Sequence, residues 1–282
     1  MENIVQLGNH RLMCGDATKA EDIEKLIGDD KIDLVLTDPP YGMKIQDIKG
    51  GIGGGNPNTA YQSVAAHLTG SIGGCPNPKK DSPNSGTITR CKQYPLLIGD
   101  NNQESARKHY ELIQDLTKHK IIWGGQYFAH FLPISGAWIF WDKENGGTDF
   151  SDGELAWRSW GKKIVKYTHK WNGVIRAGSQ ALNGKKRVHP TQKPVELHMK
   201  ILEDFSKPGD VVLDCFGGSG TTLIACEMTG RKCLMMELSP EYCDIIVKRY
   251  VRISDRTNSY EQSQSIGRAC SETPKSLDER PA

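Results

Sequence analysis

The chain has 282 residues and a formal net charge of only +2, so overall charge neither favours nor excludes a nucleic-acid partner. With 37% hydrophobic and 25% charged residues it can form a sizeable core, which excludes disorder of the whole chain. The N-terminus does not resemble a signal peptide, and no apolar run approaches the roughly 18 residues of a membrane span. We therefore expect a soluble, cytoplasmic protein whose eight cysteines are free thiols.

Short apolar runs alternate with amphipathic segments along the chain. The patterns predict strands at 31–37, 120–123, 136–141, 210–215 and 232–238. They predict helices at 21–26, 103–118, 194–206, 221–229 and 240–249. Strands that alternate with helices predict an α/β fold, in which a mostly parallel sheet is covered on both faces.

Three segments lack such a pattern. Residues 44–95 are rich in Gly, Pro, Ser and Asn, which predicts a long loop or lid inserted into the domain. Residues 145–187 are irregular and basic, and residues 254–282 are polar, which is typical of a mobile tail. We therefore predict one domain over residues 1–253, followed by the tail.

A glycine loop separates the strand predicted at 210–215 from the next helix. Its residues are Phe216, Gly217, Gly218, Ser219, Gly220 and Thr221. Glycines allow a tight turn and the close approach of a ligand, and Glu237, about 20 residues later, can accept both ribose hydroxyls of a nucleoside. This spacing fits either a nicotinamide cofactor or S-adenosylmethionine. Asp214 at the entrance of the loop would repel a pyrophosphate, but it suits the ammonium of a methionine.

A rigid turn of Asp38, Pro39, Pro40 and Tyr41 follows the strand predicted at 31–37. The two prolines fix φ and lack amide donors, so the turn exposes acceptors without competing N–H groups. The carboxylate of Asp38 and the carbonyl of Pro39 suit the two hydrogens of an exocyclic amino group, while Tyr41 can stack on a flat base. Such bonds favour a tetrahedral nitrogen whose lone pair attacks a sulfonium methyl group. The turn therefore predicts a catalytic site for a flipped-out base.

With both motifs in this order, the chain resembles the β-class amino-group DNA methyltransferases, the adenine-N6 and cytosine-N4 methylases, over most of residues 4–250. Residues 10–17, 136–143 and 189–194 match further elements of that family. The resemblance implies a Rossmann-like, S-adenosylmethionine-dependent methyltransferase sheet that is mostly parallel, with seven strands of which one is antiparallel. It also places two groups of residues at the cofactor. They are Asp16 and Ala17 near the adenine, and Thr191, Gln192 and Lys193 near the methionine, where Lys193 offers a cation for the carboxylate.

Residues 155–187 contain nine Lys or Arg and no acid, interleaved with aromatic residues. This is the electrostatic pattern that a DNA backbone requires, and the resemblance places target recognition within residues 145–187. We expect double-stranded DNA as the partner. The predicted DNA-binding residues are Arg158, Lys162, Lys163, Lys166, Lys170, Arg176, Lys185, Lys186 and Arg187.

The expected reaction is methyl transfer from S-adenosylmethionine to N6 of adenine, because the family tends to have Asp at the position of Asp38 when adenine is the target. Cytosine N4 is the alternative within the class, and RNA or protein-glutamine methylation fits the motif order and the basic region less well.

A catalytically inactive DNA-binding module and a nicotinamide dehydrogenase are alternatives from other classes. Intact acidic and aromatic motif residues disfavour the first, and the loop pattern disfavours the second. The resemblance also implies a homodimer, either with a cognate restriction enzyme or as an orphan or phage enzyme, and no metal is expected.

Overall fold

The computed structural model describes residues 3–42, 103–146, 151–171, 176–184 and 186–271, with side chains described as far as Asp255. The predicted insertion at 44–95 lies outside these residues. The strands are β1 (Ile4–Leu7), β2 (His10–Cys14), β3 (Leu34–Thr37), β4 (Lys120–Trp123), β5 (Trp138–Asp142), β6 (Gly153–Arg158), β7 (Ile164–Thr168), β8 (Val211–Asp214) and β9 (Lys232–Glu237). The helices are α1 (Ala20–Ile27), α3 (Glu104–Ile113), the 3-10 turn η2 (Gly125–Phe128), α4 (Gln180–Asn183), α5 (Val195–Phe205), α6 (Thr221–Thr229) and α7 (Pro240–Ser271).

One sheet joins all of these strands in the order β1-β2-β9-β8-β3-β4-β6-β5-β7. The pairs from β2 to β4 are parallel, as is the β5–β7 pair, whereas β1 and β6 run antiparallel to their neighbours. The predicted α/β, Rossmann-like and mostly parallel sheet is therefore confirmed. The strand count is corrected: the described sheet has nine strands rather than seven, and two of them rather than one are antiparallel.

The additional strands arise where the sequence pattern was weak. β1 and β2 form a short hairpin in which Leu7 pairs with His10. β6 and β7 lie inside the basic region that was expected to be irregular. β7 exposes Ile164, Lys166 and Thr168 and turns Val165 and Tyr167 inward, which is the period of a strand with one covered face. Charged side chains are common on edge strands, and Lys166 masked this alternation.

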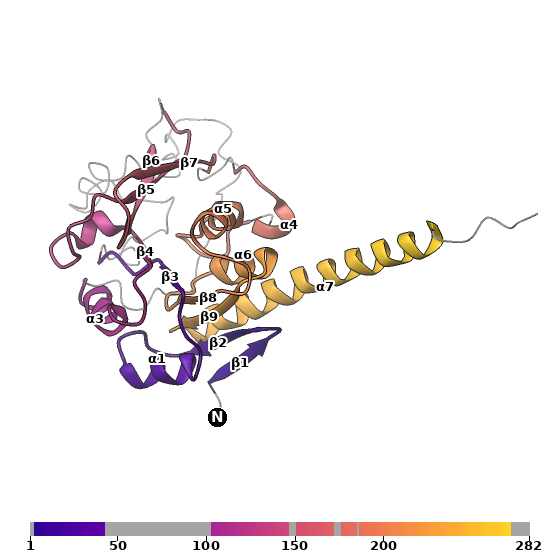
Figure 1. Cartoon of the computed structure of the whole chain (residues 1–282), viewed down its shortest axis with the longest axis horizontal. Helices are drawn as coiled ribbons and strands as arrows, with labels where there is room; N and C mark the ends of the chain where they lie inside the picture. Colours follow the sequence, from indigo (N-terminus) through magenta and orange to yellow (C-terminus); the bar gives the residue numbers. More distant parts are fainter. Residues whose placement is uncertain (1–2, 43–102, 147–150, 172–175, 185, 272–282) are drawn as a thin grey trace, which may run out of the picture.

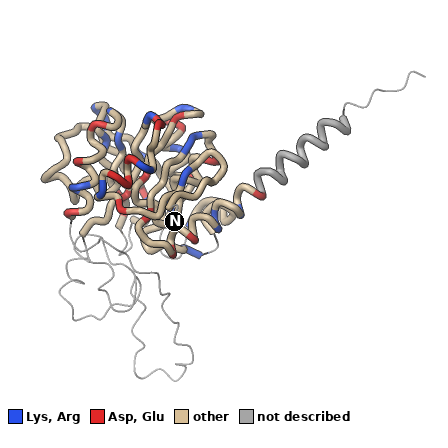
Figure 2. Tube along the Cα trace, turned by 90° about the horizontal axis from the view of Figure 1, so that it is seen from below, with Lys and Arg blue, Asp and Glu red and all other residues tan. Residues whose placement is uncertain are grey.

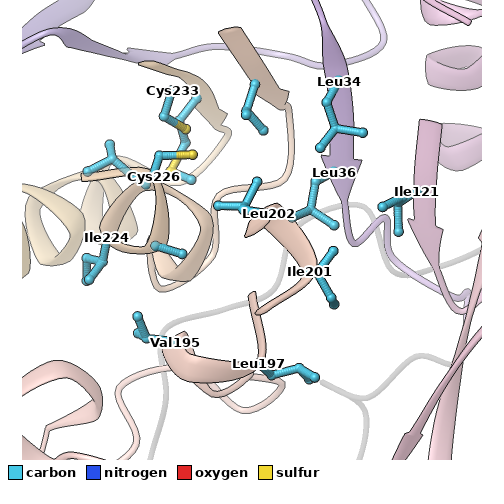
Figure 3. Packing of buried hydrophobic residues seen from close by; sticks show 14 of the residues in the cluster. Leu34, Leu36, Ile121, Val195, Leu197, Ile201, Leu202, Ile224, Cys226 and Cys233 are labelled. Atoms are coloured by element: carbon cyan, nitrogen blue, oxygen red, sulfur yellow. The ribbon is translucent and has the colours of Figure 1, made fainter. Parts of the chain in front are cut away.

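Helices cover both faces of the sheet. In Figure 1, α1 and α3 lie on one side of the central strands and α5, α6 and α7 on the other. Successive side chains of a strand point to opposite faces, so Leu34 and Leu36 join one hydrophobic cluster while Val35 joins the other. Figure 3 shows the first cluster, where Leu36 faces Ile201 and Leu202 of α5. Burial on both faces explains why the central strands are continuous apolar runs.

The last helix is much longer than the sequence pattern indicated. α7 was expected to end near residue 249, but it continues to Ser271 and extends away from the sheet (Figure 1). Tyr242, Ile246, Tyr250 and Ile253 recur at helical spacing and are buried. The polar residues beyond them resembled a tail, yet they include no proline before Pro274, so every residue up to that point has the backbone N–H that a helix uses. Among the described residues, no helix is both long and apolar enough to cross a membrane.

Candidate functional site

Four parallel strands bring the predicted site to one edge of the sheet. β2, β3, β8 and β9 end at Cys14, Thr37, Asp214 and Glu237. Because the carboxyl ends of parallel strands lie at the same edge, the turns that follow them converge, as ligand-binding turns do in open α/β sheets. They enclose a pocket with an empty volume of about 1130 Å³, including the part open to solvent.

Nearly all of the predicted catalytic and cofactor residues line this pocket. Those that do are Asp16, Ala17, Asp38, Pro39, Pro40, Tyr41, Thr191, Gln192, Lys193, Asp214, Phe216, Gly217, Gly218, Ser219, Thr221 and Glu237. The exception is Gly220, which packs against α7: a Cβ there would lie 2.9 Å from Ile246 Cγ2. Sequence reasoning missed several lining residues, of which Ser105, His198 and Tyr242 come from helices where no motif marks them.

Glu237 fixes the glycine loop against the end of β9. Its Oε2 accepts a hydrogen bond from the backbone N–H of Gly218 at 2.7 Å, and its Oε1 accepts one from Ser239 at 2.9 Å. Burial raises the pKa of Glu237, and these backbone donors oppose that rise by favouring the carboxylate. The acid that was predicted to hold a ribose therefore also shapes the loop beside it.

Asp214 is a buried carboxylate at the entrance of the loop. Its Oδ1 accepts hydrogen bonds from the Thr37 hydroxyl at 2.8 Å and from the Phe216 N–H at 3.1 Å. Burial nevertheless raises the pKa of Asp214 to about 7. Near neutral pH this group therefore changes between a neutral acid and an anion, which makes any ligand that needs the anion sensitive to pH.

Because β2 pairs with β9 and places Cys14 beside Glu237, the part of the pocket next to Glu237 is built around Asp16. Its Oδ1 accepts hydrogen bonds from the backbone N–H of Thr18 at 3.0 Å and from the Thr18 hydroxyl at 2.7 Å. The next residue, Ala17, presents its carbonyl to Nδ1 of His109 at 3.1 Å, and the His109 ring meets Phe216 edge to face at 4.9 Å. Burial lowers the pKa of His109 to about 4, so its ring is neutral and serves as packing behind Phe216.

The turn after β3 holds Asp38 by both of its carboxylate oxygens. Oδ1 accepts a hydrogen bond from the Tyr41 hydroxyl at 2.6 Å, and Oδ2 forms an ion pair with the ammonium of Lys193. The Asp38 side chain remains 20% exposed at the pocket, whereas that of Lys193 is 5% exposed. Burial, reinforced by the charge of Asp38, raises the pKa of Tyr41 well above its usual value, so its hydroxyl stays a donor. The motif thus orients its own carboxylate.

A close backbone approach supports the Tyr41 ring. Gly124 follows β4 with φ +68°, and a Cβ at this position would lie 2.2 Å from Cε1 of Tyr41. The same ring stacks on Tyr127 of η2, with centroids 4.9 Å apart, and meets the edge of Phe128 at 6.1 Å. Only glycine fits at position 124 without displacing the tyrosine, because a side chain there would be both strained and in collision.

Two further residues, of which only Glu154 lies outside every quoted motif, extend the charges around Asp38. Lys193 Nζ lies 3.5 Å from Oε2 of Glu154 on β6, and Oε1 of Glu154 pairs with Lys143. Although burial opposes ionisation, Lys143 and Lys193 lower the pKa of Glu154 to about 2. Burial also opposes the charge of Lys193, yet Asp38 and Glu154 raise its pKa. We call Asp38, Lys193, Glu154 and Lys143 the charge cluster.

Two histidines complete the pocket as neutral groups. His189 Nδ1 lies 3.1 Å from the Thr191 hydroxyl, and His198 Nδ1 lies 3.2 Å from the Thr222 hydroxyl. Burial lowers the pKa of each ring to about 3, and the charge of Lys193 adds to the effect. Neither ring therefore contributes a charge near neutral pH.

The basic region is divided between surface and core. Lys162, Lys163, Lys166 and Lys186 are exposed, and Lys170, Arg176 and Arg187 are partly buried, while Lys185 lies outside the described residues. In Figure 2, Lys and Arg are interspersed with Asp and Glu over the body of the molecule. Charge on this body is therefore mixed.

Arg158 corrects the sequence prediction for this region. Its side chain is buried, donates to the Lys163 carbonyl at 3.1 Å and packs on the Phe205 ring at 4.5 Å. Because a guanidinium enclosed in this way cannot reach a phosphate, Arg158 is not part of a DNA surface. The interleaved Trp157, Tyr167 and Trp171 are likewise buried core residues.

Fold and site together define an α/β protein with a pocket at the carboxyl edge of a parallel sheet, lined by a glycine loop and an oriented carboxylate. The chain belongs to the DNA methylase family, whose sequence model matches residues 87–248, more than half of the chain. The resemblance drawn from the motifs is thereby confirmed. S-adenosylmethionine is the methyl donor of this family, which also confirms the predicted cofactor.

Three individual relatives show how far the similarity extends. The chain is 31% identical over 147 residues to the type II methyltransferase M.HinfI of Haemophilus influenzae, covering 44% of this chain and 41% of the relative. It is 30% identical over 135 residues to the type II methyltransferase M2.LlaDCHI of Lactococcus lactis subsp. cremoris, covering 44% of each. The solved PvuII DNA methyltransferase, cytosine-N4-specific, shares the fold with a TM-score of 0.51 at 15% identity, over 90% of this chain and 93% of that one. The matched region thus spans about two fifths of the length of the two sequence relatives.

Proposed function

We propose that this chain transfers a methyl group from S-adenosylmethionine to the exocyclic N6 amino group of a flipped-out adenine in double-stranded DNA. One observation supports this most strongly: the glycine loop and the Asp38 turn line the same pocket, and Asp38 is oriented by Tyr41 and Lys193. A cofactor pocket without an oriented acceptor would suit many enzymes. A cofactor pocket together with the oriented carboxylate of Asp38 suits the methylation of an amine.

The residues that line the pocket suit the chemistry of the cofactor. We assign Asp16, Ala17 and Phe216 to the adenine end, Glu237 to the ribose hydroxyls, and Asp214 to the ammonium of the methionine. The loop glycines, Ser219, Thr221, Thr191 and Gln192 form the walls between them. When bound, the cofactor supplies an electrophilic methyl group on a sulfonium.

Lys193 belongs to the catalytic side of the pocket in this proposal. The sequence suggested that it binds the carboxylate of the cofactor. Its ammonium instead lies between Asp38 and Glu154, where two carboxylates already neutralise it. Lys193 therefore orients Asp38.

The reaction depends on how the target amine is held. Asp38 and the carbonyl of Pro39 accept its two hydrogens, which favours a tetrahedral nitrogen with a lone pair that attacks the methyl carbon. The Tyr41 ring, supported by Tyr127, stacks on the extruded base, and Pro40 keeps the turn rigid. Positioning and electrostatics dominate such an in-line transfer.

Adenine is the proposed target because Asp38 fills the position at which the family favours it, and N4 of cytosine is the alternative. The test is incubation of the protein with methyl-labelled S-adenosylmethionine and DNA free of both modified bases, followed by hydrolysis and nucleoside analysis. We expect label in N6-methyladenine. Label in N4-methylcytosine would leave the amine mechanism intact and overturn the base, and unlabelled DNA would overturn the function.

The DNA surface and the assembly are also proposals. We propose that Lys162, Lys163, Lys166, Lys170, Arg176, Lys185, Lys186 and Arg187 contact the DNA backbone. A homodimer, and a place either beside a cognate restriction enzyme or without one, rest on the family resemblance. Light scattering with and without DNA tests the dimer, and a strict monomer in both conditions would contradict it. A cytoplasmic location agrees with the free thiols of the described cysteines.

A further inference from the structure

The charge cluster contains more charges than the handling of an amine by Asp38 requires. Its members come from four separate segments and alternate in sign: Asp38 after β3, Lys193 before α5, Glu154 on β6 and Lys143 after β5. Glu154 contacts both lysines, one through each carboxylate oxygen. No motif of the sequence predicted this residue.

Lys193 creates an electrostatic problem that Glu154 offsets. Methyl transfer moves a positive charge from the sulfonium sulfur to the amine nitrogen, and a negative charge beside the nitrogen stabilises this change. Lys193 touches the carboxylate of Asp38 and, alone, would cancel much of its negative charge. Glu154 lies 3.5 Å from the same ammonium and offsets part of that cancellation, while Lys143 pairs with its other oxygen.

Glu154 also fixes where Lys193 can lie. The Lys193 ammonium is 5.0 Å from the centre of the Trp123 ring and lies between the two carboxylates. With Tyr41 on Oδ1 and Lys193 on Oδ2, the Asp38 carboxylate is held at both oxygens. Without Glu154, the ammonium loses one of its two anionic partners and becomes free to shift.

We propose that Glu154 is a positioning residue for methyl transfer: by holding Lys193 it fixes the orientation of Asp38 and preserves the negative field at the target amine. This inference rests on the proposed function of the pocket. It assigns a catalytic contribution to β6, a strand that carries no residue of the recognised motifs.

Asp30 provides a matched comparison within the same chain. Its carboxylate also joins two cations, Arg11 at 2.6 Å and Lys232 at 2.6 Å, and its side chain is 19% exposed against 31% for Glu154. Asp30 and Lys232 lie at the amino ends of β3 and β9, at the edge of the sheet opposite the pocket. Neutralising Asp30 or Glu154 removes an anion that lies between two cations. Only Glu154 contacts a residue of the pocket.

The test compares Glu154→Gln with Asp30→Asn and the wild type in single-turnover methyl transfer, at a temperature where circular dichroism shows every variant folded. We expect Glu154→Gln to lower the rate about ten-fold or more, while affinities for S-adenosylmethionine and DNA stay within about two-fold. Asp30→Asn should keep the wild-type rate. A wild-type rate in Glu154→Gln, or an equal loss in Asp30→Asn, would overturn the proposal.

The pH profile separates positioning from a general loss of structure. Asp38 and Glu154 together raise the pKa of Lys193 against the effect of burial, so the loss of Glu154 lets the ammonium deprotonate at a lower pH. As the pH rises through the basic range, the rate should therefore decline at a lower pH in Glu154→Gln than in the wild type. Glu154→Asp keeps the charge and should restore the wild-type profile. Identical profiles in all three would overturn the inference, whereas a wild type that fails to methylate DNA would overturn the proposed function itself.

Discussion

The two sides of the pocket are supported by different kinds of interaction. On the cofactor side, neutral donors hold the acids: the N–H groups of Gly218 and Ser239 donate to Glu237, and the Phe216 N–H and the Thr37 hydroxyl donate to Asp214. On the amine side, a phenol holds one oxygen of Asp38 and an ammonium holds the other. The neutral donors on the cofactor side come mostly from the local backbone, whereas the ion pair on the amine side needs a charge from a distant segment. The amine side should therefore be the more sensitive to single substitutions.

The largest loss of methyl-transfer rate is expected for a substitution at Gly124, whose backbone lies against the Tyr41 ring. In Gly124→Ala, a Cβ would collide with the Tyr41 ring at 2.2 Å, and the φ of +68° would be strained. Because a displacement of about 1 Å can cost about 100-fold in rate, we expect a loss of that order in methyl transfer.

Gly209→Ala is the control for Gly124→Ala. Gly209 has φ +89° but no neighbouring atom within 4 Å of an added Cβ. Both variants should lose about 1–3 kcal/mol in the free energy of unfolding, as measured by denaturant titration. Equal activity in the two variants would show that the contact with Tyr41 is unimportant.

The next effect concerns the hydroxyl of Tyr41. Tyr41→Phe keeps the stacking ring but removes the donor that holds Asp38 Oδ1 at 2.6 Å. A hydrogen bond to a charged group contributes about 1.5–3 kcal/mol, so the single-turnover rate should fall about ten-fold or more with little change in DNA affinity. Tyr110→Phe, outside the pocket lining, should leave the rate unchanged. A single-turnover rate for Tyr41→Phe equal to that of the wild type would show that the hydroxyl does not contribute to methyl transfer.

The affinity for S-adenosylmethionine should depend on pH through Asp214. Burial raises the pKa of Asp214 to about 7, so this group is anionic above that pH and neutral below it. If the anion binds the ammonium of the cofactor, affinity should be full above about pH 7 and should weaken by up to about ten-fold per unit below it. Calorimetry across this range tests the assignment. Asp214→Asn should bind weakly without this dependence, and a flat wild-type profile would remove Asp214 from the contact.

The smallest effect is expected at the DNA surface. Each phosphate contact contributes about 0.9 to the slope of log K against log salt, so replacing Lys162, Lys163 and Lys186 by Gln should flatten that slope by up to about 3. Lys118, Lys200 and Lys207 are also exposed and lie outside the basic stretch, so the same triple replacement there is the control. Equal slopes in the two triple variants would exclude the stretch as the main contact.

The contrast between the two sides also explains what the sequence could predict. Asp214, Glu237 and the glycine loop lie on a strand–loop–helix unit whose order is local, and the structure places them together as expected. Glu154 and Lys143 reach Asp38 only through the pairing of β6 with β4 and β5, which no local pattern encodes. The prediction that Arg158 contacts DNA was wrong for the same reason, since its burial depends on contacts with Trp160 and Phe205.

The length of α7 and the number of strands show the same division between local and non-local information. The central strands were recognisable because burial on both faces makes them apolar. β7 was not recognisable, because its exposed Lys166 masked a two-residue period. The end of α7 was missed because a polar sequence without proline is compatible with either a tail or a helix.

The central claim is that Asp38 acts on the amine and not on the binding of either substrate. The most direct measurement is single-turnover transfer of labelled methyl groups to duplex DNA by the wild type and by Asp38→Ala, with calorimetric affinities for S-adenosylmethionine and DNA on both proteins. We predict that transfer by Asp38→Ala collapses by about 100-fold or more while both affinities stay within a few-fold, because the lost acceptor matters most as the nitrogen becomes tetrahedral. Transfer by Asp38→Ala at a rate near that of the wild type would contradict the mechanism.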